Sequence, residues 1–202
     1  MAKIEAVLFD WGGVLIDNPA PGLMAYCAKA LGLSVAQYTQ AHSTHGEPFQ
    51  KGQIAEAVFW QRVCNDLGRP LPSQSSLWGE AFRAVYSPRS GVFTLAGALR
   101  QTGCKTSLLS NTEAPAMEFF LELDYDVFDA LTFSCAEGTA KPQKEIYEIA
   151  ARKLSAAPAQ CVLIDDKPDF IEGARNAGME GILYENLGQV TRELVRLGIQ
   201  TD

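Results

Sequence analysis

Five short apolar runs, rich in branched and aromatic side chains, are spread along this chain. They are IEAVLF (4–9), TSLLS (106–110), FDALTF (128–133), CVLID (161–165) and GILY (181–184). Stretches with the periodicity of an amphipathic helix separate the last four runs, for example 145–154 and 169–177. Short buried strands that alternate with helices are typical of a parallel sheet with helices on both faces. The pattern therefore predicts an α/β fold with three layers.

The segment 17–88 interrupts this alternation. It contains no convincing strand, but helical periodicity runs through 22–31, 54–67 and 76–85. Turn-forming residues predict loops between these stretches, in HGEP (45–48), GRPLP (68–72) and SPRSG (87–91). At 202 residues the chain is long enough for one sizeable core and a small inserted module. We therefore predict a core from 1–16 and 89–202, with residues 17–88 forming a small α-helical cap.

Composition narrows the class of protein. The formal net charge is −7, and no run of Lys or Arg offers the basic patch that binding to nucleic acid requires. No apolar stretch approaches the roughly 18 residues of a membrane-spanning helix, so no membrane partner is expected. The five cysteines are scattered and lack CxxC spacing, which is typical of reduced thiols in a cytoplasmic protein. The oligomeric state stays open.

Polar residues stand where the predicted strands end. Ligands of an open parallel sheet bind at the carboxyl ends of its strands, so we expect these residues to share one rim. They are Asp10 after the first run, Ser110 and Asn111 at the second, Asp165 and Asp166 at the fourth, and Lys141 before the helical stretch 145–154. Close carboxylates repel one another unless a cation lies among them, and hard oxygen ligands suit Mg²⁺. The set predicts Mg²⁺-dependent phosphate chemistry with Asp10 as a covalent nucleophile.

Each of these residues also has a purely structural interpretation. Asp10 and the glycines after it could end a strand in a tight turn. Asp165 and Asp166 could cap the helix that follows them, and Lys141 could be a solvated lysine ahead of a helix. The functional interpretation is favoured because four separate strand-end positions supply what one reaction requires.

Four segments, in order along the chain, resemble the motifs of a known family. FDWGGVL, LLSNT, AKPQKEIY and LIDDKPDFIEGARNAGM are similar to the four motifs of the haloacid dehalogenase-like hydrolase superfamily. The stretch FSCAEGTAKPQKEIYEIA resembles its phosphatase-like branch, in which a helical cap follows the first strand. The resemblance implies a Rossmann-like core whose parallel sheet has the strand order 5-4-1-2-3.

The resemblance also implies roles for individual residues. Asp10 would be the nucleophile, Lys141 would assist it, and Asp169 would orient the metal ligands by hydrogen bonding. The residues expected to bind magnesium are Asp10, Gly12 (through its carbonyl), Asp165 and Asp166. The residues expected to contact phosphate or substrate are Trp11, Ser110, Asn111 and Lys141.

Gly12 departs from the family pattern. Phosphatases of this family usually carry a second Asp at this position, which protonates the leaving oxygen and later activates water. Loss of such a general acid/base typically costs about 10²–10⁴-fold in rate for leaving groups that need a proton. A phosphomutase is therefore not expected, whereas an anomeric sugar phosphate or an acyl phosphate has a less demanding leaving group. Sugar-1-phosphate phosphatases that resemble this branch also have Gly at this place.

The cap is expected to select the substrate. The segment 44–52 (THGEPFQKG), together with Trp11, is predicted to line the site, and Trp60 is predicted to lie in the core of the cap. His42 and His45 are the only histidines, would share one face of a helix, and are interpreted as exposed cap residues. Asp17 is interpreted as the hinge into the cap.

The predicted function is Mg²⁺-dependent hydrolysis of a small phosphorylated metabolite, such as a sugar phosphate, through an aspartyl phosphate. One alternative is a 2-haloacid dehalogenase, in which Asp10 would attack carbon without a metal and leave Asp165 and Asp166 unexplained. The other is a non-catalytic binding protein that kept the fold and lacks the acid/base at Gly12. Retention of Asp10, Lys141 and both acids argues against that second alternative.

Overall fold

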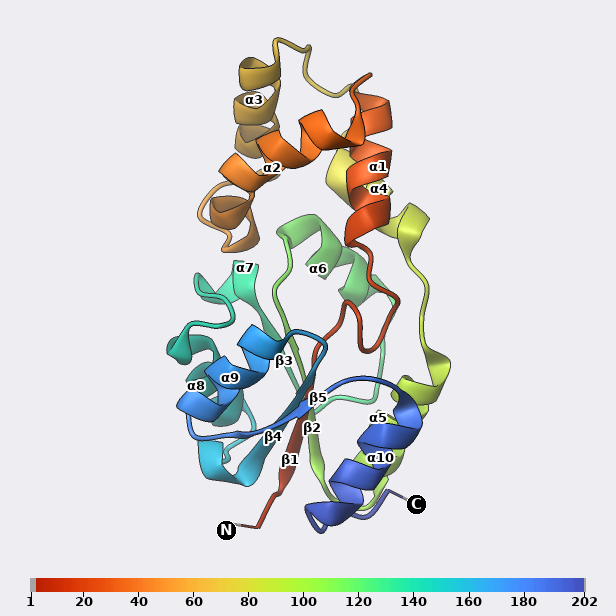
Figure 1. Ribbon diagram of the computed structural model, residues 1–202, viewed down its shortest axis with the longest axis vertical. Helices are drawn as coiled ribbons and strands as arrows, with labels where there is room; N and C mark the ends of the chain where they lie inside the picture. Colours follow the sequence, from red (N-terminus) through yellow and green to blue (C-terminus); the bar gives the residue numbers. More distant parts are fainter. Residues whose placement is uncertain (1–2, 202) are drawn as a thin grey trace.

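The sheet confirms the predicted α/β architecture. The computed structural model describes residues 3–201. Neighbouring strands are parallel and follow the order β3-β2-β1-β4-β5, which is the predicted order 5-4-1-2-3 read from the other edge (Figure 1). The strands are β1 (Ala6–Phe9), β2 (Lys105–Ser110), β3 (Ala130–Phe133), β4 (Cys161–Asp165) and β5 (Glu180–Leu183). Each of them overlaps one of the predicted apolar runs.

The register of the central strand decides which residues meet at the rim. Phe9, the last residue of β1, pairs with Leu108 of β2 and with Ile164 of β4. Asp10 directly follows Phe9, and Asp165 directly follows Ile164. Because paired residues of neighbouring strands point to the same face, the next residue of each strand does so as well. The two carboxylates are thus delivered side by side.

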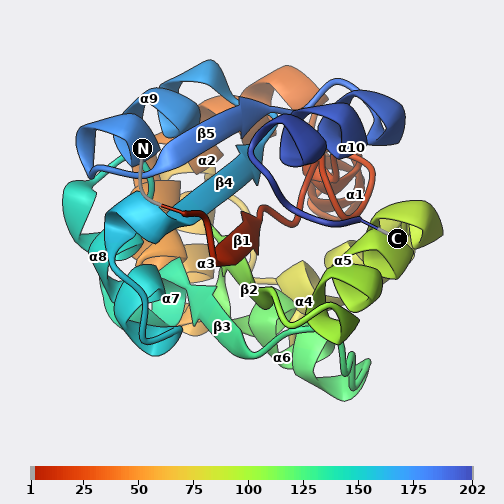
Figure 2. The same ribbon diagram turned by 90° about the horizontal axis from the view of Figure 1, so that it is seen from below.

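Helices cover both faces of this sheet. Along β1, Ala6 and Leu8 pack in one apolar cluster with α8 and α9, while Val7 and Phe9 pack in another with α5 and α10. Figure 2 shows these two pairs of helices on opposite sides of the strands. The helical segments of the core are α5 (Ser90–Gln101), α6 (Ala114–Glu122), α7 (Ser134–Glu137), α8 (Lys144–Lys153), the 3-10 helix η1 (Pro158–Gln160), α9 (Pro168–Asn176) and α10 (Leu187–Arg196). The three predicted layers are therefore present.

A helical cap stands beyond the carboxyl ends of the strands (Figure 1). Its helices are α1 (Ala20–Ala30), α2 (Val35–Gln50), α3 (Glu56–Leu67) and α4 (Leu77–Val85). Aromatic rings fill the space between them: Phe49 and Phe59 stack with their centroids 4.6 Å apart, and Trp60 is buried. The prediction that Trp60 lies in the core of the cap is confirmed.

The prediction of a loop at HGEP (45–48) is wrong, because these residues lie inside α2. The helix begins at a capping box, in which the Ser34 Oγ accepts a hydrogen bond from the Gln37 backbone and the Gln37 side chain accepts one from the Ser34 backbone. Pro48 removes one N–H donor only two residues before the last residue of the helix, Gln50. The buried ring of Phe49 holds this last turn against the cap, so burial outweighs the local preference for a loop.

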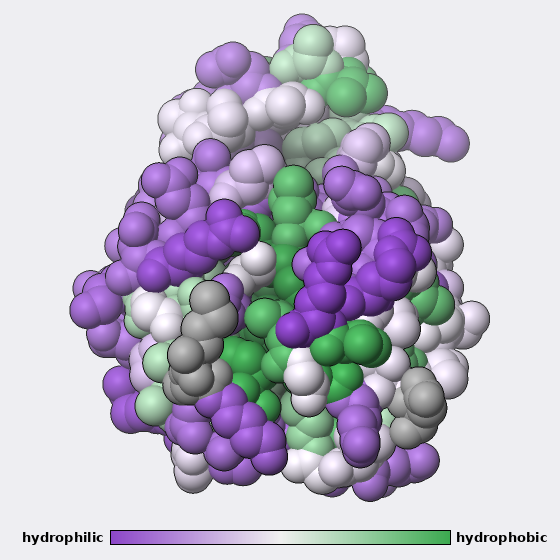
Figure 3. Space-filling model, turned by 60° about the horizontal axis from the view of Figure 1, so that its bottom comes forward, coloured by the Kyte–Doolittle hydropathy of each residue, from purple (hydrophilic) through white to green (hydrophobic). Residues whose placement is uncertain are grey.

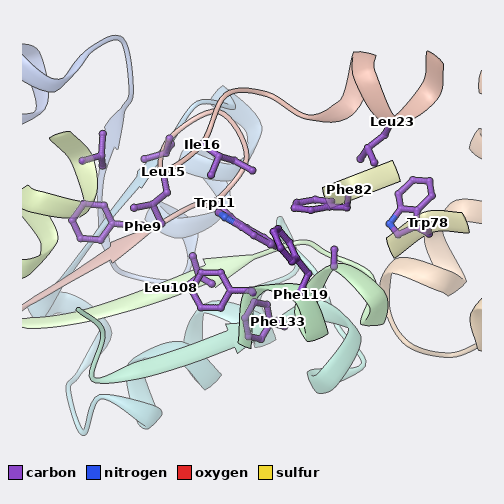
Figure 4. Close-up of a cluster of buried hydrophobic side chains, with 14 of the residues drawn as sticks. Phe9, Trp11, Leu15, Ile16, Leu23, Trp78, Phe82, Leu108, Phe119 and Phe133 are labelled. Atoms are coloured by element: carbon purple, nitrogen blue, oxygen red, sulfur yellow. The ribbon is translucent and has the colours of Figure 1, made fainter. Parts of the chain in front are cut away.

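One apolar cluster continues from the sheet into the cap (Figure 4). Trp11, in the loop after β1, connects the two parts. The centroid of its ring lies 4.6 Å from that of Phe82 in α4 and 5.1 Å from that of Phe120 in α6. Core and cap therefore share buried apolar surface directly above the ends of the strands.

The end of the molecule away from the cap shows a strip of apolar side chains among hydrophilic ones (Figure 3). Exposed large apolar side chains of β5 and α10 include Leu183, Leu187 and Val195.

No helix between residues 3 and 201 is both long and apolar enough to cross a membrane.

The loop after β1 folds tightly around one carbonyl group. The Trp11 carbonyl accepts hydrogen bonds from the backbone N–H groups of Leu15 and Ile16, at 2.9 and 3.0 Å. Gly13 allows this turn with a φ of +95°, which L-residues with a side chain rarely adopt. A Cβ at Gly13 would lie only 2.2 Å from Oδ2 of Asp166. Gly13 therefore lets the loop approach that carboxylate closely.

We predict that Gly13→Ala destabilises the protein more than Gly32→Ala does. Gly32 is a matched control, since its φ is +65° but an added Cβ would meet nothing within 4 Å. The control should lose about 1–2 kcal/mol of unfolding free energy through backbone strain alone. Gly13→Ala should lose about 1–3 kcal/mol more, because the Asp166 side chain must be displaced. Urea unfolding measures both, and equal losses would show that Asp166 moves aside freely.

Candidate active site

A single ammonium group binds two carboxylates at the rim of the sheet. Nζ of Lys141 donates hydrogen bonds to Oδ1 of Asp10 at 2.8 Å, to Oδ2 of Asp165 at 2.5 Å and to the carbonyl of Leu109 at 3.0 Å. A lysine ammonium has three donors, so all of them are used. Lys141, Asp10 and Asp165 are buried, with 3%, 6% and 0% of their surface exposed. The structure thus brings together three of the residues that the sequence singled out.

This buried group of side chains contains more negative than positive groups. It raises the pKa of Asp10 to about 6, and Asp165 adds to the rise while Lys141 opposes it. Burial also raises the pKa of Asp166, and the Asp165 carboxylate adds to that effect. Burial would lower the pKa of Lys141, but the carboxylates of Asp10 and Asp165 outweigh it and raise that pKa. One ammonium facing three carboxyl groups favours a further cation.

The carboxylates of Asp10, Asp165 and Asp166 fit such a cation. One oxygen from each lies within 4.8 Å of the others. Oδ1 of Asp165 accepts a hydrogen bond from the backbone N–H of Lys167 at 2.9 Å, which fixes that side chain. Oδ1 of Asp166 is buried and has no hydrogen-bond partner within residues 3–201. Converging oxygen ligands of this kind suit Mg²⁺.

Gly12 lies beside this group, in the wall of the cavity above it. A Cβ added there would come within 3.0 Å of Cδ of Pro19, closer than ordinary van der Waals contact. Pro19 directly precedes α1, at the entry into the cap. The loop therefore leaves little room for an aspartate at position 12. The use of the Gly12 carbonyl as a metal ligand stays a prediction.

Asn111 holds the backbone of Lys141. Its Oδ1 accepts a hydrogen bond from the N–H of Lys141 at 2.8 Å, and its Nδ2 donates one to the Lys141 carbonyl at 2.9 Å. This role could not be predicted from the sequence, because the two residues lie 30 positions apart and meet only through the fold. Ser110 is 3% exposed and lines the cavity with Asp10. The predicted contacts of Asn111 and Ser110 with phosphate stay predictions.

A cavity of about 160 Å³ lies between this rim and the cap. The cap side of its wall includes Leu23, Met24, His42, Gln50, Trp78 and Phe82. Of the segment 44–52, predicted to line the site, only Gln50 does so among the described residues. Trp11 belongs to the wall, although its side chain is packed between aromatic rings and only 1% exposed.

The side chains of both histidines are less exposed than predicted. His42 stacks on Trp78 with ring centroids 5.1 Å apart, and burial lowers the pKa of His42 to about 4. His45 is also partly buried and its Nε2 lies 2.6 Å from Oδ2 of Asp66. The expectation of exposed cap histidines is therefore wrong, because α2 turns this face toward α3 and α4. His42 lines the cavity and His45 does not.

Glu113 is a buried acid that the sequence analysis missed. It is 5% exposed and lines the cavity. Its Oε2 accepts a hydrogen bond from Nε1 of Trp78 at 3.1 Å, and its Oε1 accepts one from Nε2 of Gln50 at 3.4 Å. Burial raises the pKa of Glu113 to about 7. A glutamate shortly after an apolar run is typical of a solvated position, so its contacts with Trp78 and Gln50 of the cap could not be predicted from the sequence.

Two further acids lie outside the cluster. Asp169 is exposed in the first turn of α9 and makes no hydrogen bond to Asp165 or Asp166 within the described residues. Its predicted role in orienting the ligands stays a prediction. Asp17 accepts hydrogen bonds from Nε of Arg89 at 2.9 Å and Oγ of Ser87 at 2.8 Å, so it joins the two connections between core and cap.

Several proteins are similar to this sequence over most of its length. A flavin mononucleotide hydrolase of Arabidopsis thaliana is 36% identical over 201 residues, which cover 98% of this chain and 79% of that protein. A sesquiterpene phosphatase of Aspergillus oryzae is 26% identical over 181 residues, covering 88% of each. The mouse acyl-CoA dehydrogenase family member 10 is 28% identical over 209 residues, but this chain spans only 19% of that protein.

The fold is also shared with solved structures. An enzyme of the haloacid dehalogenase family from Bacteroides thetaiotaomicron, in complex with magnesium and inorganic phosphate, superimposes with a TM-score of 0.74. It is 20% identical, and the match covers 93% of this chain and 98% of that one. A family model described as haloacid dehalogenase-like hydrolase matches residues 4–178. This chain therefore belongs to the family of haloacid dehalogenase-like hydrolases.

Proposed function

We propose that this protein is a Mg²⁺-dependent phosphatase that hydrolyses a small phosphorylated metabolite through an aspartyl phosphate on Asp10. The observation that carries the proposal is the buried Lys141 ammonium shared by Asp10 and Asp165, beside the third carboxylate of Asp166. The names of two relatives, a sesquiterpene phosphatase and a flavin mononucleotide hydrolase, support it. So does the magnesium and phosphate bound by the Bacteroides enzyme of the same fold.

In the first step an oxygen of Asp10 attacks phosphorus, and the bond from phosphorus to the leaving oxygen breaks. Lys141 holds the attacking carboxylate and offsets charge on the phosphoryl oxygens. Ser110 donates a hydrogen bond to one of these oxygens. Asp10, Asp165 and Asp166 would hold Mg²⁺, which would supply the positive charge that lets an anionic nucleophile meet an anionic substrate. Water then attacks the phosphorus, which releases phosphate and restores Asp10.

The cavity favours a compact leaving group. Its volume of about 160 Å³ is small beside the roughly 300–1,000 Å³ of pockets that hold drug-sized ligands. The wall combines the aromatic rings of Trp78 and Phe82 with polar groups on His42 and Gln50. A small leaving group with both apolar and hydroxyl-bearing surface, such as that of a sugar phosphate, matches this wall.

We predict that Asp10→Asn lowers phosphate release by at least about 10³-fold, because the amide keeps the shape of the side chain and lacks its nucleophilic charge. The measurement is phosphate release from a panel of small phosphate esters with and without Mg²⁺. Full activity of the variant would contradict the aspartyl phosphate. Chloride release from a 2-haloacid without Mg²⁺ would instead support attack on carbon, and no turnover of any ester would support a binding protein.

We predict that Mg²⁺ raises the melting temperature of the wild-type protein by several degrees, since a ligand at about 100 times its Kd stabilises by about 2.7 kcal/mol. Asp166→Asn should remove most of this shift. In the absence of Mg²⁺ the same variant should be at least as stable as the wild type, because it relieves repulsion among the carboxylates.

Asp169→Asn is the matched control for this measurement, since Asp169 lies three residues further on and is exposed. A full Mg²⁺ shift in this variant together with a lost shift in Asp166→Asn assigns the ligand role to Asp166. A lost shift in both would support the predicted role of Asp169 in orienting the ligands. An unchanged shift in Asp166→Asn would contradict the proposed metal site.

A further inference from the structure

The proposed reaction needs a proton at the leaving oxygen, and Gly12 has no group to supply it. A Cβ at this position would lie 3.0 Å from Cδ of Pro19, so a side chain there would require the loop or Pro19 to shift. Of the described residues, those with titratable side chains in the cavity wall are Asp10, His42, Glu113 and Lys167. Asp10 is the proposed nucleophile, and Lys167 directly follows the metal-binding pair in its loop. His42 and Glu113 are left as candidate proton donors.

His42 is poorly suited to donate a proton at neutral pH. Its ring is packed against Trp78, Phe59 and Tyr38, with centroids 5.1, 5.6 and 5.9 Å away. Burial lowers the pKa of His42 to about 4, so the imidazolium form is scarce near pH 7. The neutral ring can give or accept a hydrogen bond, but it is a far weaker acid than the imidazolium form and a poor proton donor to a leaving oxygen.

Glu113 is placed where core and cap meet. It lies three residues beyond Ser110, in the wall of the same cavity as Asp10. Both hydrogen bonds to its carboxyl group come from the cap, from Trp78 of α4 and from Gln50 of α2. The carboxyl group is therefore held by the cap helices, whereas the carboxylates of Asp10, Asp165 and Asp166 belong to the core.

None of the described charged and titratable groups around Glu113 offsets the negative charge of its ionised form. The nearby titratable groups on α2 and α7 are Tyr38 and Cys135, and burial raises the pKa of both, with Glu113 adding to the rise. The basic residues of the neighbouring helices are paired elsewhere: Lys51 with Glu47, and Arg83 with Glu122. His42 stacks on Trp78, the residue whose indole N–H donates a hydrogen bond to Glu113. No described ammonium or guanidinium group forms an ion pair with Glu113.

We propose that Glu113 is the general acid and base that replaces the missing aspartate of the first motif. The inference rests on the proposed phosphatase function. As Asp10 forms its bond to phosphorus, the leaving oxygen keeps the electron pair of the broken bond and takes the proton from the Glu113 carboxyl. The Glu113 carboxylate then takes a proton from the water that attacks the aspartyl phosphate. Phosphate leaves, and both side chains return to their starting states.

The pH dependence follows from this assignment. The first step needs protonated Glu113, and burial raises the pKa of that group to about 7. For a leaving group that needs a proton, kcat/KM should therefore fall as pH rises through about 7. For acetyl phosphate, whose acetate departs without a proton, this fall should be absent.

The test compares Glu113→Gln with the wild type on two substrates, the best alkyl phosphate of the ester panel and acetyl phosphate. We predict a loss of kcat/KM of about 10²–10⁴-fold for the alkyl phosphate. The loss for acetyl phosphate should be at least tenfold smaller. The matched control is Glu118→Gln, an exposed glutamate of the same helix, which should change kcat/KM by less than twofold for both substrates.

A second variant tests the assignment even if Glu113→Gln fails to fold. The indole N–H of Trp78 lowers the pKa of Glu113 by its hydrogen bond, so Trp78→Phe should move the fall in kcat/KM for the alkyl phosphate to higher pH. Equal losses on both substrates, or an unmoved pH profile, would overturn the inference. Absence of hydrolysis by the wild-type protein would instead overturn the proposed function.

Discussion

The shared ammonium group of Lys141 is the interaction on which the rest of the site depends. Placing ionised groups away from water costs several kcal/mol for each ion, and this is offset only where geometry is good and the remaining donors are satisfied. All three donors of Lys141 are used, two of them by the carboxylates of Asp10 and Asp165. The order of the sheet makes this possible, because β1 and β4 are neighbours. Asn111 adds the third constraint by holding the Lys141 backbone from the end of β2.

Much of this arrangement could be predicted from the sequence. The apolar runs and their spacing were sufficient to locate all five strands, because buried parallel strands leave a strong local signal. The resemblance to the family supplied the order of the strands. The carboxylates followed from their positions at strand ends, and Lys141 followed from its position before the helical stretch 145–154. The parts that were missed depend on contacts distant in sequence. The loop predicted at 45–48 is helical because Phe49 is buried, and Glu113 is a buried acid because α2 and α4 cover it.

The glycines after Asp10 are constrained from two directions. At Gly13 the Asp166 carboxylate approaches so closely that any side chain would collide with it. At Gly12 the space is limited by Pro19, where the chain enters the cap. The loop after β1 packs closely against the Asp166 carboxylate and therefore has little room for an acid at position 12. A proton donor for the leaving group then has to come from another strand end.

In the proposed role of proton donor, Glu113 would link proton transfer to the cap. Its carboxyl group takes both side-chain hydrogen bonds from cap residues, Trp78 and Gln50, while its backbone belongs to the core. Both bonds lower the pKa of Glu113, against the larger effect of burial by the same cap. A cap that moved away would remove the burial as well as the bonds, and the carboxyl group would lose its proton near pH 7. Only the closed arrangement thus keeps a protonated acid in the cavity, which couples enclosure of the substrate to the ability to protonate its leaving group.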